Sequence, residues 1–131
     1  FESGGAGLVS TIDDYAAFAQ MLLQNGSCLL SPKTVEFMTG SRLMPALQND
    51  VNRWESMPGY TYANLLRIMT NPEIAVSMGS RGEYGWDGWL GPYMTNDPAN
   101  RLTLLIMQQK TGSGTTEYTR KIRNVVFSSL A

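Results

Sequence analysis

Residues 79–109, GSRGEYGWDGWLGPYMTNDPANRLTLLIMQQ, contain the segments of this sequence that most clearly predict paired β-strands. Aromatic residues lie between glycines at 83–89 and follow again at 93–96, DPAN at 97–100 has turn chemistry, and 102–108 is a nearly continuous apolar run. We therefore predict an antiparallel meander on which the rest of the chain packs. The run at 102–108 is too uniformly apolar for a strand with one solvent-exposed face. We therefore expect it to lie between a helix layer and a second covering element.

The composition fits one α+β domain over residues 1–131, since 43% of the residues are hydrophobic and a chain of this length can bury a core. Ten basic and eleven acidic residues are spread along the sequence, which predicts no nucleic-acid or anionic-membrane partner. No apolar run approaches the ~20 residues of a membrane helix, so we expect a soluble protein with no membrane segment. The sequence begins at Phe1 without a signal-peptide pattern, which favours a fragment of a longer protein and leaves its compartment unknown.

The sequence contains one cysteine, Cys28, and no histidine. An internal disulfide and any Ser-His-Asp or Cys-His site within these residues are therefore excluded. A single cysteine with carboxylates is a poor ligand set for zinc, so we expect no metal site and no cofactor.

Two helices are predicted before the meander. The first begins after a cap at Ser10 or Thr11 and ends at Gly26, and the second begins at the Ser31-Pro32 pair and ends at Gly40. In the first helix the apolar positions at helical spacing are Ile12, Tyr15, Ala19 and Leu22.

The middle of the sequence is the least regular part. PALQNDVNRWE at 45–55 can form a brief helix, 60–70 is predicted as one strand of mixed quality, and 74–78 as another short strand. A polar loop and a closing helix follow the meander. We expect the closing helix to face the sheet with Tyr118, Ile122, Val125, Val126 and Ser129, and to turn Arg120, Lys121 and Arg123 outward.

Three stretches carry a resemblance to a known family: GGAGLVSTIDDYAAFAQMLLQNG (4–26), LLSPKTVEFMTG (29–40) and GEYGWDGWLGPYMTNDPANRLTLLIMQQ (82–109). In order and spacing they resemble the C-terminal part of the serine hydrolases related to class C β-lactamases, which include penicillin-binding DD-peptidases and family VIII esterases. The resemblance implies the C-terminal portion of a β-lactamase/transpeptidase-like fold, in which an antiparallel sheet is flanked by helices and the active site lies between sheet and helical subdomain.

The family uses a Ser-x-x-Lys nucleophile motif, a Tyr-x-Asn or Ser-x-Asn motif, and a Lys-Thr-Gly motif or a variant on a sheet strand. No Ser-x-x-Lys occurs in this sequence, so we predict no catalytic residue here and no activity for these residues alone. Tyr62-Ala63-Asn64 and Lys110-Thr111-Gly112 spell the other two motifs, but both stand at the wrong place in the family's order, and we interpret both as coincidences.

Trp86, Asp87 and Gly88 match the Trp-x-Gly or His-x-Gly variant of the third motif, and the resemblance implies that they bind substrate at the acyl pocket. A strand glycine permits close approach, and a neighbouring backbone N–H can help to bind an oxyanion. The alternative is an aromatic strand with a glycine bulge and no such role. Asp87 departs from the family's usual small residue, and its charge is expected to oppose an anionic intermediate.

These observations predict part of a serine hydrolase that cleaves a small-molecule ester, amide or β-lactam through an acyl-serine in the full-length protein. The alternative function is a non-catalytic binding or interaction domain of the same architecture. We also expect the strand at 102–108 to pair with the missing N-terminal portion or with a second copy. It contains neither proline nor a charged residue, which would disfavour pairing at an exposed strand edge.

Overall fold

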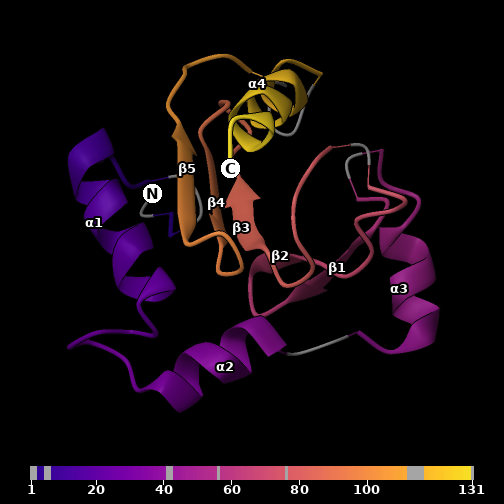
Figure 1. Cartoon of the computed structure of the whole chain (residues 1–131), viewed down its shortest axis with the longest axis horizontal. Helices are drawn as coiled ribbons and strands as arrows, with labels where there is room; N and C mark the ends of the chain where they lie inside the picture. Colours follow the sequence, from indigo (N-terminus) through magenta and orange to yellow (C-terminus); the bar gives the residue numbers. More distant parts are fainter. Residues whose placement is uncertain are drawn as a thin grey trace.

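A computed structural model describes residues 3–4, 7–40, 43–55, 57–75, 77–111 and 117–130. Its centre is a five-stranded antiparallel sheet whose spatial order follows the chain, β1-β2-β3-β4-β5 (Figure 1). The strands are β1 (Tyr60–Ala63), β2 (Leu66–Met69), β3 (Tyr84–Asp87), β4 (Tyr93–Asp97) and β5 (Leu102–Ile106). The predicted meander and the α+β class are confirmed, and the Asp97-Pro98-Ala99-Asn100 turn joins the last two strands.

The prediction of one strand at 60–70 is wrong, because β1 and β2 form a hairpin with a two-residue loop. Asn64 and Leu65 both have positive φ, 47° and 68°, as the tight turn between twisted antiparallel strands requires. Asparagine tolerates this conformation well, whereas leucine adopts it rarely, so only one of the two loop residues is typical of such a turn. The strand predicted at 74–78 is also wrong, since residues 74, 75, 77 and 78 form a turn and irregular backbone.

Helices cover both faces of the sheet, as the alternation of side chains along β4 shows. Asn96 points to one face and donates to the Ala19 carbonyl at 2.7 Å, on helix α1 (Ile12–Leu23). Tyr93 points to the other face, where its hydroxyl accepts from Arg123 on helix α4 (Glu117–Ser128). Successive residues of a strand point to opposite faces, so α1 and α4 flank the sheet from two sides (Figure 1).

The predicted helix starts are confirmed by their caps. Thr11 accepts from the Asp14 amide at 3.2 Å at the start of α1, and Ser31 accepts from the Thr34 amide at 3.1 Å before helix α2 (Pro32–Gly40). The brief helix exists as α3 (Pro45–Val51). Of the apolar positions predicted in α1, Ala19 and Leu22 are buried, whereas Ile12 is 50% exposed. No helix in the described ranges is long and apolar enough to cross a bilayer.

The orientation predicted for the closing helix is wrong in part: Lys121 is exposed as expected, but other positions are not. Tyr118 and Val125, expected in the core, are 59% and 70% exposed, while Arg123, expected outside, is fully buried. The buried positions of α4 are Thr119, Arg123 and Phe127. The helix turns this stripe inward because Arg123 finds the buried carboxylate of Glu83, a partner that the helical periodicity of the sequence does not reveal.

Candidate functional site

The predicted site residues lie where β3 separates from β2. The ladder between β2 and β3 contains two residue pairs, ending at Arg67 opposite Gly85, whereas β3 pairs with β4 along its full length to Asp87 opposite Tyr93. Trp86 and Asp87 therefore extend beyond the last β2 pair. Gly88 follows directly in the connection to β4.

Trp86 forms an aromatic wall at this strand end. Its side chain is 38% exposed, and its ring packs edge to face against Tyr62, with the ring centroids 5.3 Å apart. Tyr62 comes from β1, two strands away in the sheet order, and the sequence did not predict it beside Trp86. Trp89 and Leu90 in the following turn are 78% and 44% exposed and extend the apolar surface.

Gly88 is a tight packing point in the β3–β4 turn. A Cβ at this position would meet Pro92 Cγ at 2.9 Å, so any side chain must displace the proline ring. The Gly88 N–H donates to the Pro92 carbonyl at 2.8 Å, and the Gly88 carbonyl accepts from Gly91 at 2.9 Å. The N–H of Gly88 itself is therefore committed to the turn, and an oxyanion would have to use another donor.

Asp87 lies against a buried cation that the sequence analysis did not single out. Arg67 on β2 is 1% exposed, and its Nη1 donates to Asp87 Oδ1. Its guanidinium also lies over the rings of Tyr60 and Tyr93, 5.2 and 5.0 Å from their centroids. Burial lowers the pKa of Arg67, but Tyr93 and Asp87 raise it by more, so the net shift is upward and the charge is retained. The sequence feature that could have indicated a buried, ion-paired Arg67 is its place as the single charged residue in the apolar run LLRIM.

A second buried ion pair lies on the other side of Tyr93. Arg123 holds Glu83 through two hydrogen bonds of 2.7 Å, and Glu83 also accepts from the Thr95 hydroxyl at 2.7 Å. Arg123 and Glu83 are both 0% exposed. Burial acts to lower the pKa of Arg123, but Tyr93 and Glu83 outweigh it and hold the pKa above its usual value. This pair anchors α4 to the sheet.

The two other motif-like triplets have structural explanations. Asn64 lies in the β1–β2 turn, and its side-chain amide donates to the Phe37 and Met38 carbonyls at 3.2 and 3.4 Å, which caps the end of α2. Lys110 lies in a loop after β5, with its backbone N–H on the Leu90 carbonyl at 2.7 Å. It opens no strand, and Gly112 lies outside the described residues.

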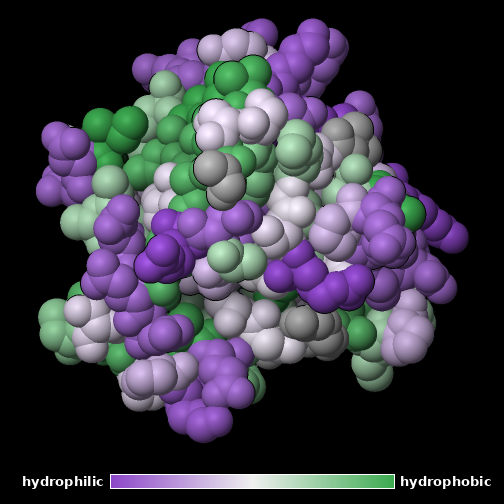
Figure 2. Space-filling model, viewed as in Figure 1, coloured by the Kyte–Doolittle hydropathy of each residue, from purple (hydrophilic) through white to green (hydrophobic). Residues whose placement is uncertain are grey.

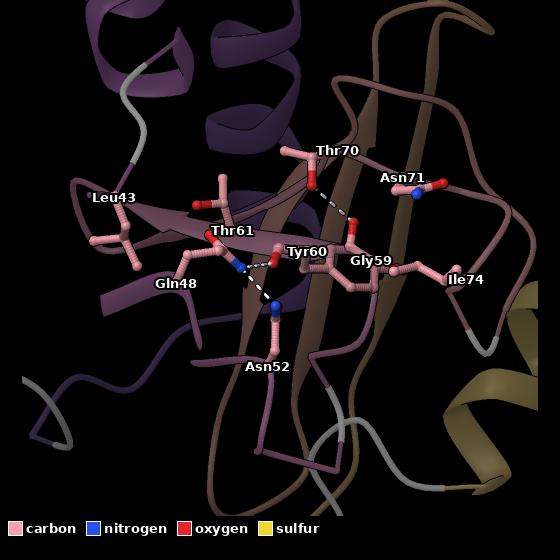
Figure 3. Close-up of a pocket in the computed structure, with 9 residues that line it drawn as sticks. All are labelled: Leu43, Gln48, Asn52, Gly59, Tyr60, Thr61, Thr70, Asn71 and Ile74. Atoms are coloured by element: carbon pink, nitrogen blue, oxygen red, sulfur yellow. Dashed lines mark hydrogen bonds between the residues drawn. The ribbon is translucent and has the colours of Figure 1, made fainter. Parts of the chain in front are cut away.

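A pocket of about 240 Å³ lies away from Trp86, between α3 and the β1–β2 hairpin (Figure 3). Gln48 crosses it and donates to the Tyr60 carbonyl at 2.8 Å and to Asn52 at 2.7 Å. The buried Thr61 hydroxyl in its wall has no hydrogen-bond partner within the described ranges. Its nine lining residues carry no charge and include none of the predicted site residues: Leu43, Gln48, Asn52, Gly59, Tyr60, Thr61, Thr70, Asn71 and Ile74. In the same described ranges, no three His, Cys, Asp or Glu side chains form a group able to hold a metal ion.

Comparisons with known proteins agree with this architecture. The structure is similar to EstCE1, a hydrolase with promiscuous acyltransferase activity, with a TM-score of 0.80 and 22% identity over 95% of this chain and 32% of that one. It is also similar to simvastatin synthase LovD of Aspergillus terreus, in its LovD6 mutant form, with a TM-score of 0.73 and 19% identity over 88% and 33% of the two chains. At these identities the likeness establishes the fold.

Sequence relatives point the same way. Protein Rv1367c and uncharacterized protein MT1414, from two strains of Mycobacterium tuberculosis, are each 31% identical over 119 residues, covering 83% of this chain and 29% of theirs. The chain thus spans about a third of the length of the relatives it matches. The Beta-lactamase family model matches residues 1–126. By this match, which covers most of its length, the chain belongs to the β-lactamase family.

Proposed function

We propose that this chain is the C-terminal portion of a serine hydrolase in which Trp86, Asp87 and Gly88 line the acyl pocket. In the full-length protein an upstream serine attacks the carbonyl of an ester, amide or β-lactam, the leaving group departs, and water then releases the acyl group from the serine. The isolated chain has no Ser-x-x-Lys pair and is inactive on its own.

The separation of β2 from β3 is the observation that carries the assignment of this site. Strand backbone at such an end is accessible from one side, and its N–H groups can approach a substrate carbonyl. Trp86 and Tyr62 place an aromatic wall beside it, which suits an apolar acyl or alcohol group. Arg67 lies buried behind Asp87 and forms an ion pair with its carboxylate.

Covalent labelling tests this proposal. We expect a fluorophosphonate probe to label one serine of the full-length protein, located upstream of Phe1, and to leave the 131-residue chain unlabelled. Labelling of a serine within the chain would contradict the proposal that the nucleophile lies upstream and that this chain only lines the acyl pocket. A full-length protein that neither reacts with the probe nor hydrolyses p-nitrophenyl esters would favour the binding-domain alternative.

We also propose that the outer edge of β5 pairs with another strand, either from the N-terminal portion of the protein or from a second copy. β5 ends the sheet, its five residues LTLLI are uncharged and half-buried, and apolar surface gathers over it (Figure 2). Such an edge is a template for strand addition.

Light scattering of the isolated chain tests this pairing, and we expect an oligomer or aggregate rather than a 14.5 kDa monomer. Leu104→Lys, which charges the strand, should shift the chain toward the monomer. Slow amide exchange along β5 in a monomeric wild-type chain would show that the edge is already covered.

A further inference from the structure

The wall of the pocket between α3 and the β1–β2 hairpin contains a buried hydroxyl group, that of Thr61. This residue is 2% exposed, and its Oγ1 has no hydrogen-bond partner in the part of the chain that the structure describes. Most buried side-chain polar atoms in proteins are paired, so an unpaired one indicates a partner outside the protein. In Figure 3 the hydroxyl is turned to the side of the pocket where Gln48 and Leu43 lie.

The Thr61 hydroxyl can reach a molecule in this pocket without any movement of the backbone. Its oxygen is shielded from solvent in the observed rotamer. Rotation about χ1 to another staggered position exchanges the hydroxyl with the methyl group or the hydrogen on Cβ. More than one χ1 position is common in β-strands. A ligand that offers a hydrogen bond can therefore draw the hydroxyl toward itself.

The side-chain amides beside Thr61 also have unused hydrogen-bonding groups. Gln48 uses its Nε2 for both of its bonds, to the Tyr60 carbonyl at 2.8 Å and to Asn52 Oδ1 at 2.7 Å, which leaves its own Oε1 as an acceptor. Asn71 accepts a backbone N–H at 3.1 Å through Oδ1, which leaves its amide nitrogen as a donor. Because each amide carries both kinds of group, the pocket offers donors as well as acceptors.

The charge and the size of the pocket restrict what it can bind. None of its nine lining residues is charged, so an ion that enters it would lose hydration without gaining a counter-charge. Its volume of about 240 Å³ lies below the range of roughly 300–1,000 Å³ that is usual for drug-sized ligands. A hydroxyl group both donates and accepts, and several hydroxyls on one small molecule would match this mixture of groups.

We propose that this pocket binds a small, uncharged polyol, of the size of a single sugar ring, through Thr61 and the amides of Gln48, Asn52 and Asn71. The site is separate from the proposed acyl pocket, because none of Trp86–Gly88 lines it. The proposal therefore does not depend on the hydrolase function.

Saturation-transfer NMR of the full-length protein with D-glucose as the probe tests this proposal. We expect saturable binding, and Thr61→Val, which keeps the shape of the side chain and removes the hydroxyl, should weaken it about three- to tenfold through the loss of one hydrogen bond. Asn52→Ala, at an exposed position after α3, should weaken it by a similar factor. Thr103→Val is the matched control, since it makes the same change on β5, outside the pocket, and should leave the Kd unchanged.

The stability of Thr61→Val gives a second and independent measurement. Removing an unpaired hydroxyl should not lower the urea midpoint, whereas a lower midpoint would show that the hydroxyl is already paired and would overturn the proposal. If this variant does not fold, Asn52→Ala still tests the site. Absence of glucose binding, or equal binding by wild type and both pocket variants, would overturn it as well. Binding of acetamide with no binding of glucose would replace the polyol by an amide ligand.

Discussion

Two arginines that are buried among the described residues, Arg67 and Arg123, have similar surroundings but partners of different accessibility. Arg123 and Glu83 are both fully buried and joined by two hydrogen bonds, whereas Arg67 is buried and its partner Asp87 is 20% exposed. The ring of Tyr93 lies between them, 5.0 Å from Arg67 and 5.8 Å from Arg123. One pair is closed within the structure, and the other opens onto the strand end that we propose as the acyl pocket.

The difference in exposure between the two ion pairs suggests that one holds a helix in place and the other affects ligand binding. Burying an ion pair completely requires the desolvation of both charges. Removing only one of the two partners is strongly destabilising, because the other charge remains buried without its counter-ion. In the Arg67–Asp87 pair, removal of the arginine leaves a carboxylate that is 20% exposed and that water can solvate. Arg123–Glu83 is therefore expected to determine whether α4 docks, and Arg67–Asp87 to determine what the strand end presents to a ligand.

The largest expected effect is on stability. Glu83→Gln should reduce the free energy of unfolding of the full-length protein by about 3–5 kcal/mol, because it strands the buried Arg123 charge. Arg67→Met, which leaves the 20% exposed Asp87 carboxylate as the remaining charge of the other pair, should cost less, about 1–2 kcal/mol, since water can reach that carboxylate. Urea unfolding of both variants measures the difference. Equal losses would remove the distinction between the two pairs.

The next effect is on catalysis and tests the choice of strand. Gly88→Val should lower kcat/KM of the full-length protein for a p-nitrophenyl ester at least ~100-fold, because the new side chain displaces Pro92 and blocks the approach. Lys110→Ala in the loop after β5 should leave the rate within about threefold of wild type. Circular dichroism confirms that both variants are folded. The reverse pattern would place the acyl pocket at Lys110.

The smallest effect is expected at alkaline pH, beside Arg67. Burial, followed by the charge of Glu83, raises the pKa of Tyr60 to about 12. In the unfolded chain tyrosine ionises near pH 10. The protonated form is thus favoured by folding, and stability is complete below pH 10 and falls as the pH rises to about 12.

We expect a loss on the order of 2 kcal/mol over this range from Tyr60. Urea unfolding midpoints at successive pH values measure it. Tyr60→Phe should make the profile shallower, while Tyr118→Phe, at a tyrosine that is 59% exposed, should leave it unchanged. A profile that Tyr60→Phe does not alter would show that Tyr60 is not the group responsible.

Local signals predicted the elements that local chemistry controls. The cap at Thr11, the Ser31-Pro32 start and the alternation of aromatic residues with glycine around Trp86 each act over a few residues, and each was confirmed as a helix start or a strand. The β1–β2 hairpin was missed because its turn places Leu65, which carries no turn signal, at φ 68°. That conformation is imposed by the strands on either side and not by the residue itself.

The sequence by itself determined the class of this protein, its meander and its membership of the β-lactamase family, because these depend on order, spacing and periodicity. Only the tertiary structure decided which face of α4 is buried and what stands behind Asp87. An arginine reads as a surface residue in any local pattern, since its burial is unfavourable until a distant carboxylate is present. Glu83 lies 40 residues from Arg123, and Asp87 lies 20 residues from Arg67, so neither pair was visible before the chain was folded.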